Sequence, residues 1–314
     1  RAGHEVELSV PNRHTGISES VSDYYGIEQN FTVSRLFVID LVSWGKLGFL
    51  IESISFAVVA AQYLRGVRGM IYGRDECVLR GLSMSGVKNI VWESHTGAWN
   101  ACARFLSRNT RLIVAISNGL RNFYVEQSVD AEKILVAHDG VDLVSFMHSE
   151  SKNEARTRLG IPLDKPVALY IGRIDMWKGV DTLCEAASAL ENIYVVVIGG
   201  EAEQVRASQI KYPRVLFLGS RPYRDIARNL AAGDVLVLPN TGQQLIAARY
   251  TSPLKLFAYM ASGVPIISSD LPSSREVLTN ESAYWFRSDD AQDLARAIRE
   301  ALSDPVASQK AMIG

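Results

Sequence analysis

The 314-residue sequence is 47% hydrophobic and 21% charged, a balance that supports folded cores and argues against a disordered chain. Its 33 basic and 34 acidic residues nearly cancel, which argues against a protein whose main task is to grip nucleic acid. The three cysteines, Cys77, Cys102 and Cys184, form no CxxC pair, so we expect free buried thiols in a reducing compartment, the cytoplasm.

In the first half of the chain, short apolar segments alternate with amphipathic ones. Strands are expected at residues 4–10, 31–37, 69–72, 89–93, 111–116 and 134–136, and helices at 47–64, 76–85, near 98–106 and near 118–126. Segment 47–64 is the most apolar, but Glu52 and Gln62 interrupt it, which favours a core helix over a membrane span. Arg1-Ala2-Gly3 is typical of the end of a helix, so we expect a further element before residue 1.

The alternation starts again after a polar bridge at residues 149–165, where we place the boundary between two domains, 1–150 and 151–314. Strands are expected at 167–171, 194–198, 215–218, 235–238 and 264–267, and helices at 180–190, 223–232, about 252–262 and 291–301. This order predicts an α/β fold in which parallel sheets carry helices on both faces. Two such domains in tandem predict a cleft with ligands at the carboxyl ends of the strands.

The second domain is organised around the stretch Thr251–Asp270. Ser252 is a candidate helix cap, Pro253 suits the first turn, and Gly263 supplies a left-handed stop. The apolar positions of this helix, expected to face the sheet, are Leu254, Phe257, Ala258 and Ala261, and its opposite face carries Lys255, Tyr259 and Ser262. The free N–H groups at its start predict an anion site, although any α/β protein has several such helices.

Basic and glycine residues follow the strands of the second domain. Arg173 and Lys178 lie in a loop flanked by Gly172 and Gly179. Two cations beside a backbone that a ligand can approach closely suit a phosphate site, but the same residues also suit an ordinary solvated loop. Gly199-Gly200 and Gly219 end the next two strands. These glycines do not form the GxGxxG pattern of dinucleotide-binding proteins.

Together these segments resemble the carboxyl-terminal half of a retaining glycosyltransferase of family 4, which has the GT-B fold of two Rossmann-like domains facing a cleft. The motifs that carry the resemblance are IGRIDMWKGVD, FLGSRPYRDIARNLAAGDVLVLPN and YTSPLKLFAYMASGVPIISSDLPSSREVL, in that order. The first domain matches more loosely, through GHEV, YGRD, WESH, AIS and GVD.

The resemblance implies transfer of a sugar from a nucleotide diphosphate donor to a hydroxyl, with the anomeric configuration retained. Arg173 and Lys178 would hold the diphosphate in place of a metal, completed by the amides of Thr251, Ser252, Pro253 and Leu254. The base and ribose would lie along Gly199-Gly200 and Gly219–Pro222, which includes Arg221. His95 would contact the donor sugar or the departing acceptor proton. No cofactor and no metal is expected.

The sequence departs from the family pattern in two ways. Family members commonly carry two glutamates, one near the sugar hydroxyls and one on the ribose, at the positions of Tyr250 and Ala258. Ala258 is either natural divergence or an engineered change, and restoring glutamate there would then tighten nucleotide binding. The family also has a strand, a glycine-rich loop and a helix before GHEV, and a closing helix after the last residue here, so we expect a fragment whose first domain lacks its first strand.

The resulting interpretation is a cytoplasmic glycosyltransferase that works on a glycan or a lipid-linked acceptor at the inner face of a membrane. One alternative is a catalytically weak or inactive nucleotide-sugar-binding protein. Another is a different GT-B enzyme, such as a sugar-nucleotide epimerase. The sequence does not identify the donor sugar, the base, the acceptor or the oligomeric state.

Overall fold

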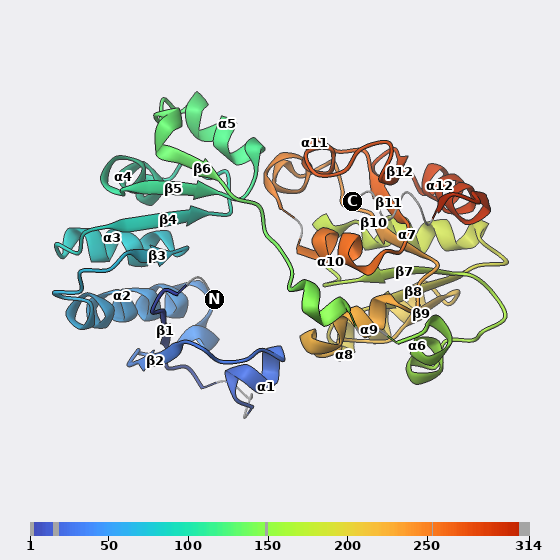
Figure 1. Ribbon diagram of the computed structural model, residues 1–314, viewed down its shortest axis with the longest axis horizontal. Helices are drawn as coiled ribbons and strands as arrows, with labels where there is room; N and C mark the ends of the chain where they lie inside the picture. The colour runs from blue at the N-terminus through green and yellow to red at the C-terminus, as the bar shows by residue number, and fades with distance from the viewer. Residues whose placement is uncertain (1–2, 15–18, 148–149, 253, 308–314) are drawn as a thin grey trace. The chain divides into compact units, whose positions relative to one another are not determined.

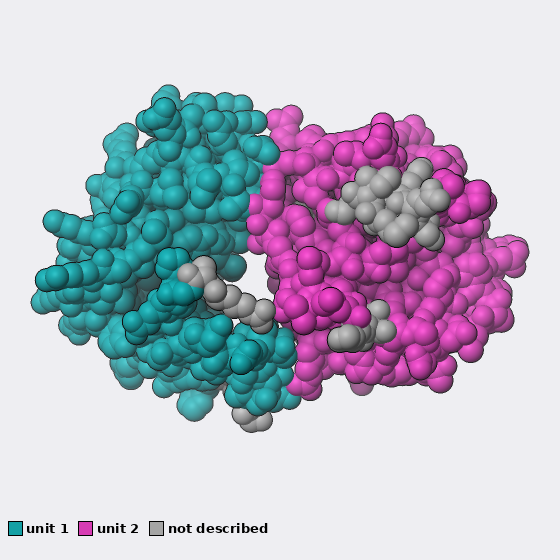
Figure 2. Space-filling model, in the orientation of Figure 1, with its two compact units in different colours: residues 1–137 teal, residues 138–314 magenta. Residues whose placement is uncertain are grey.

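A computed structural model describes residues 3–14, 19–147, 150–252 and 254–307 of the chain. The chain divides into two compact units, residues 1–137 and 138–314, coloured separately in Figure 2. Residues 138–147 belong to the second unit because the 3₁₀ turn η3 (Leu143–Phe146) packs against helices of that unit. The predicted domain boundary near residue 150 therefore lies inside the second unit.

The strands of the first unit form two separate parallel sheets (Figure 1). They are β1 (Glu7–Pro11), β2 (Thr32–Leu36), β3 (Ile71–Gly73), β4 (Ile90–Ser94), β5 (Leu112–Ala115) and β6 (Ile134–Val136). Strands β1 and β2 pair with each other, and the other four pair in the order β3-β4-β5-β6. That a strand is missing from this unit stays a prediction.

The helices of the first unit begin at side-chain caps in several cases. They are α1 (Val21–Tyr25), α2 (Lys46–Tyr63), α3 (Glu76–Met84), α4 (Ala101–Asn109) and α5 (Asn118–Glu126), with short 3₁₀ turns η1 (Val42–Trp44) and η2 (Ala131–Lys133). Asp75, Asn100 and Ser117 each accept backbone N–H groups of the helix that follows, which satisfies donors that the helix itself leaves free.

Helix α2 is less buried than expected of a core helix. Its 18 residues have a mean hydropathy of 1.2, so by length and composition alone the helix could cross a membrane. Of this helix, 28% is buried inside the protein. Leu47 and Ile54 are 73% and 56% exposed. On its buried side, Glu52 is ion-paired with Arg13, and the helix packs against α3. The prediction of a core helix is therefore wrong for this unit as described.

The second unit contains one six-stranded parallel sheet in the order β12-β11-β10-β7-β8-β9 (Figure 1). The strands are β7 (Val167–Ile171), β8 (Tyr194–Ile198), β9 (Val215–Phe217), β10 (Val235–Leu238), β11 (Ile266–Ser269) and β12 (Ala283–Phe286). The chain first winds outward from β7 to β9, then crosses back to β10 on the other side of β7. The strand order therefore reverses between β7 and β10.

Helices cover both faces of this sheet and bury two apolar clusters. They are α6 (Lys152–Leu159), α7 (Val180–Ala186), α8 (Ala202–Lys211), α9 (Ile226–Leu230), α10 (Leu254–Ser262), α11 (Pro272–Arg275) and α12 (Ala291–Ser303), with 3₁₀ turns η4 (Met176–Lys178), η5 (Ala187–Ala189) and η6 (Tyr223–Asp225) and a π-helix η7 (Ile246–Tyr250). One cluster joins α7 and α12 to the sheet, and the other joins α6, α9 and α10. Alternate residues of β7, such as Ala168 and Leu169, enter opposite clusters, as a doubly wound sheet requires.

Helix α10 turns a different face to the sheet than its spacing predicts. Leu254, expected to be buried, is 55% exposed, whereas Tyr259, expected outside, is fully buried. The Tyr259 hydroxyl accepts the backbone N–H of Ile171 at 3.0 Å, which anchors the helix to the end of β7. Leu256 and Ala258 complete the buried face. Strand β11 also extends further than expected, since Ser268 and Ser269 belong to it and are fully buried.

Ala258 lies within the apolar cluster of the second unit, at 1% exposure. We expect Ala258→Glu to lower the melting temperature by roughly 5–15 °C, because a carboxylate would be buried there without a partner. Ala207→Glu, on the exposed side of α8, is the matched control and should melt like the parent. Unchanged melting of Ala258→Glu together with tighter nucleotide binding would contradict this placement.

Candidate functional site

The reversal of strand order places two loops side by side at the carboxyl ends of β7 and β10, where open α/β sheets bind their ligands. The loop after β7 carries Arg173 and Lys178, as the sequence predicts. The loop after β10 begins at Pro239 and is joined to the first loop by a hydrogen bond from the Thr241 N–H to the Trp177 carbonyl. The candidate site is this pair of loops together with the first turn of α10.

The two predicted cations of the first loop are in different environments. Arg173 is 85% exposed on its side chain and lies 3.3 Å from Asp175 through its Nε atom. Lys178 instead places its ammonium 3.4 Å from the centre of the Trp177 ring. Burial lowers the pKa of Lys178 to about 8, the charge of Asp175 opposes this shift, and the charge of Arg173 adds to it.

A third cation, Lys255, belongs to the site, although its position on the helix predicts only a polar face. Its Nζ donates to the Tyr170 hydroxyl at 3.0 Å, and that hydroxyl donates to the Arg173 carbonyl at 2.8 Å. Burial and the charge of Lys178 hold the pKa of Lys255 well below its usual range. Burial lowers the pKa of both lysines, so a bound anion would stabilise the charged form of both ammonium groups.

The predicted glycines come together at the ends of three neighbouring strands. The Gly172 N–H donates to the Ile198 carbonyl, and the Gly199 N–H donates to the Gly219 carbonyl, both at 2.9 Å. A Cβ on Gly199 would lie 1.9 Å from the Gly172 oxygen, so no other residue fits. The Ser220 hydroxyl donates to the Gly200 carbonyl at 3.0 Å. Arg221 and Pro222 follow on the exposed surface.

The segment before α10 is only partly as predicted. Tyr250 ends the π-helix η7, and the N–H of Thr251 donates to the Ile246 carbonyl at 2.9 Å. That amide is therefore used within the chain and is not a free donor for a ligand. The hydroxyl of Ser252 accepts the N–H of Asp139 at 3.1 Å. Pro253 lies outside the described residues.

Asn240, directly after β10, is a further polar residue of the site that the sequence analysis did not identify. Its side chain is fully buried, yet neither its Nδ2 nor its Oδ1 atom has a hydrogen-bond partner among the described residues. Its backbone lies against Gly179, where a Cβ would be 1.7 Å from the Pro239 oxygen. An unsatisfied amide in this position is a candidate for a contact that only a bound molecule supplies.

In the first unit, His95 follows β4 and is hydrogen-bonded through Nε2 to Glu93. The other carboxylate oxygen of Glu93 accepts the Tyr72 hydroxyl. Burial opposes ionisation of Glu93, but the hydrogen bonds from Tyr72 and His95 outweigh it and lower its pKa. A carboxylate that orients one ring nitrogen leaves the other available for proton transfer.

The cysteines are free thiols, but they are not all buried as expected. Cys184 is buried in the second unit, whereas Cys77 is exposed at the start of α3. The sulfur atoms of Cys77 and Cys102 are 3.6 Å apart. Partial desolvation of the thiol and its contact with Cys102 raise the pKa of Cys77 to about 11. Within the described residues, no group of three or more His, Cys, Asp or Glu side chains could hold a metal ion.

The lowered pKa of Lys178 can be measured directly. In pulse labelling with acetic anhydride, read by peptide mass spectrometry, the rate at Lys178 should rise through a midpoint of about 8. The exposed Lys88 is the internal control for labelling by the reagent. If both lysines respond to pH in the same way, Lys178 is not the buried cation described here.

Comparison with known proteins gives a family match for the second unit. The family described as "Glycosyl transferases group 1" matches residues 165–304. TuaC of Bacillus subtilis, a protein named for teichuronic acid biosynthesis, is 27% identical over 203 residues, which are 64% of this chain and 49% of TuaC. The D-inositol 3-phosphate glycosyltransferase of Mycobacterium bovis is 28% identical over 188 residues, 56% of this chain and 39% of that enzyme. The chain thus spans about half or less of these relatives.

Among solved structures, Anabaena Alr3699/HepE, crystallised in complex with UDP and glucose, has a TM-score of 0.72 at 18% sequence identity. The match covers 90% of this chain and 80% of that one, so both units are included. Two units with parallel sheets and flanking helices are the architecture expected from the sequence. Residues 165–304 thus match the group 1 glycosyltransferases, and the two units have the GT-B fold of such enzymes.

Proposed function

We propose that this protein transfers a sugar from a nucleotide diphosphate donor to a hydroxyl of a glycan or lipid-linked acceptor, with retention of configuration at the anomeric carbon. The observation that supports this most is the lysine pair at the carboxyl end of β7, where burial holds both pKa values below the usual range. A bound diphosphate would raise both pKa values and so stabilise the charged form of both ammonium groups. The match of residues 165–304 to the group 1 glycosyltransferases supports this class of reaction.

In this proposal Arg173, Lys178 and Lys255 bind the donor diphosphate. The diphosphate gains negative charge as its bond to the sugar breaks, so fixed cations stabilise the transition state more than the ground state. The three residues would then do without a metal ion. The exposed Arg173 would turn toward the ligand, whereas the two lysines already contact Trp177 and Tyr170.

The base and the ribose of the donor would lie along Gly199-Gly200 and the segment 219–222. Glycine leaves the backbone of these strand ends bare, so that a planar ring can approach it closely. Tyr250, Ser252 and Leu254 would contact the sugar or the diphosphate from the start of α10. UDP is the first nucleotide to test, because the HepE structure was solved in complex with UDP and glucose.

His95 would act on the donor sugar or on the proton that leaves the acceptor. Its hydrogen bond to Glu93 fixes the orientation of the ring. In that case Glu93 is a positioning residue that acts through His95. We place the protein in the cytoplasm, at the inner face of a membrane when its acceptor is lipid-linked.

Release of free nucleotide diphosphate from UDP-, GDP- and ADP-sugars, with and without acceptor extracts, tests the proposal. Lys178→Ala should raise the barrier by about 2–4 kcal/mol, roughly a 30- to 1000-fold loss in kcat/KM, because it removes a charge-assisted contact. Lys211→Ala is the matched control, since Lys211 also lies over an aromatic ring, that of Tyr212, but pairs with Asp181 and belongs to neither loop of the site. EDTA should leave the activity unchanged.

Two results would count against this function. Full activity of Lys178→Ala would exclude the lysine as a diphosphate ligand, and loss of activity in EDTA would show that a metal is required. If nucleotides bind but no donor is consumed under any condition, the protein is a nucleotide-sugar-binding protein and not a transferase.

A further inference from the structure

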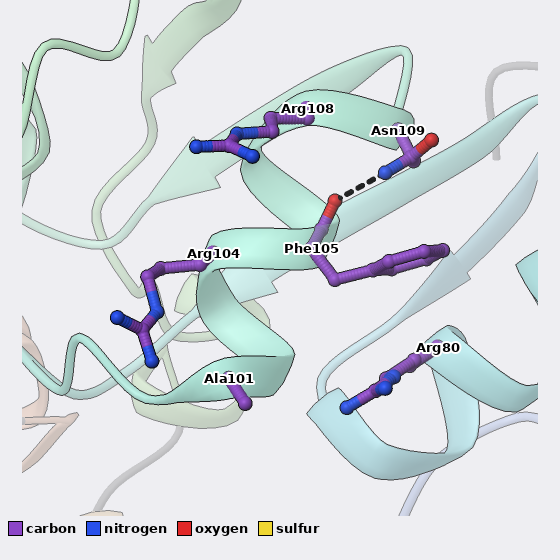
Figure 3. A pocket seen from close by; sticks show the side chains of 6 residues that line it. All are labelled: Arg80, Ala101, Arg104, Phe105, Arg108 and Asn109. Carbon is purple, nitrogen blue, oxygen red and sulfur yellow. Dashed lines mark hydrogen bonds between the residues drawn. The ribbon is translucent and has the colours of Figure 1, made fainter.

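A second cluster of cations lies in the first unit, on the outer surfaces of α3 and α4. A surface pocket of about 440 Å³ is lined by Arg80 of α3 and by residues of α4. The α4 residues are Ala101, Arg104, Phe105, Arg108 and Asn109. Three of the six lining residues are arginines, and none is acidic. Figure 3 shows Arg104 and Arg108 extending to the same side from successive turns of α4, with Arg80 reaching from α3 below Phe105.

None of these three arginines pairs with a carboxylate among the described residues, whereas several arginines elsewhere in the chain do. Arg158, Arg275 and Arg296 each lie within 2.8 Å of a carboxylate oxygen. In contrast, the side chains of Arg104 and Arg108 make no hydrogen bond or ion pair within the described parts of the chain. Three uncompensated guanidinium groups around one pocket repel one another, and an anion would relieve that repulsion.

The pocket also has the features that would hold an anion in a defined position. The Arg80 guanidinium is 5.5 Å from the centre of the Phe105 ring and also contacts the sulfur of Cys102, so its orientation is restricted. Asn109 donates to the Phe105 carbonyl at 2.7 Å, which restricts the orientation of its side chain beside the pocket. Phe105 and Ala101 supply an apolar wall between the charges.

We propose that this pocket binds a phosphate group of a ligand distinct from the donor nucleotide. Guanidinium groups pair with phosphate oxygens in a bidentate fork, and three of them match the charge of a phosphate monoester or a diphosphate better than that of a single carboxylate. The source of the phosphate is either a free phosphorylated molecule or the headgroup of an anionic lipid, and both present the same chemistry to Arg80, Arg104 and Arg108.

Calorimetric titration of the full chain with inorganic pyrophosphate at low salt tests the pocket. All proteins carry Lys178→Gln, which weakens binding of pyrophosphate at the proposed donor site. Arg104→Gln/Arg108→Gln should weaken binding about ten-fold or more, since it removes two charge-assisted contacts. Arg65→Gln/Arg68→Gln removes two exposed arginines elsewhere on the same unit and should leave the affinity unchanged.

A charge-preserving variant separates a shaped site from a diffuse basic surface. Arg104→Lys/Arg108→Lys keeps the charge but not the fork, so its affinity should fall between those of the parent and the glutamine variant. Affinity equal to that of the parent would overturn the proposal. Equal weakening by the glutamine pair and by the Arg65/Arg68 control would overturn it as well.

Sedimentation with vesicles identifies the source of the phosphate. If the ligand is a lipid headgroup, the chain should bind phosphatidylcholine vesicles only when they contain phosphatidylglycerol, and the Arg104/Arg108 glutamine variant should lose that binding. If it is a free phosphorylated molecule, pyrophosphate binds and the two vesicle types do not differ. Absence of both pyrophosphate binding and vesicle discrimination would refute the inference.

Discussion

The close approach of backbone at the carboxyl ends of β7, β8 and β10 is the constraint on which the second unit depends. Gly199 leaves less than 2 Å for a Cβ before the Gly172 carbonyl, and Gly179 leaves less than 2 Å before that of Pro239. Any side chain at these two positions would force neighbouring strand ends apart. The loops after β7 and β10 can share one site only because these glycines are present. The strand reversal therefore determines where the two loops lie, and the glycines allow the loops to approach each other there.

The charge and burial of two lysines determine what this site can bind. Lys178 and Lys255 lie beneath aromatic rings and close enough for the charge of one to affect the other, with Asp175 as the nearby carboxylate that opposes their loss of charge. Such a pair is costly in the empty protein, because each ammonium gives up hydration without gaining a full counter-charge. The cost is recovered when an anion binds. A site built in this way favours the most highly charged species on the reaction path, which in a sugar transfer is the departing diphosphate.

Much of this arrangement could be predicted from the sequence, because strand–helix alternation and glycine-tipped strands are local signals. The strands of the second unit at Val167–Ile171, Tyr194–Ile198 and Val235–Leu238 lie where the apolar runs predict them. The face of α10 could not be predicted, since the tertiary hydrogen bond from Ile171 to the Tyr259 hydroxyl overrides the apolar count and leaves Leu254 exposed. Lys255 was missed for the same reason, as its partner Tyr170 is distant in sequence. Helix α6 was predicted as a polar bridge because only Ala155 and Leu159 of its eight residues are apolar, and its start is marked instead by the Ser151–Glu154 capping box.

The central claim is that a nucleotide diphosphate binds beside Lys178 when the lysine is charged. Calorimetry of UDP binding between pH 7 and pH 9, repeated in buffers of different ionisation enthalpy, measures this directly through the protons exchanged. Because the pKa of free Lys178 is about 8 and a bound diphosphate raises it, the protein should take up protons near pH 8, and its affinity should fall as the pH rises through that value. Lys178→Arg, which stays charged throughout, should show a weaker pH dependence. Binding without proton uptake, at an affinity that does not change with pH, would contradict the account.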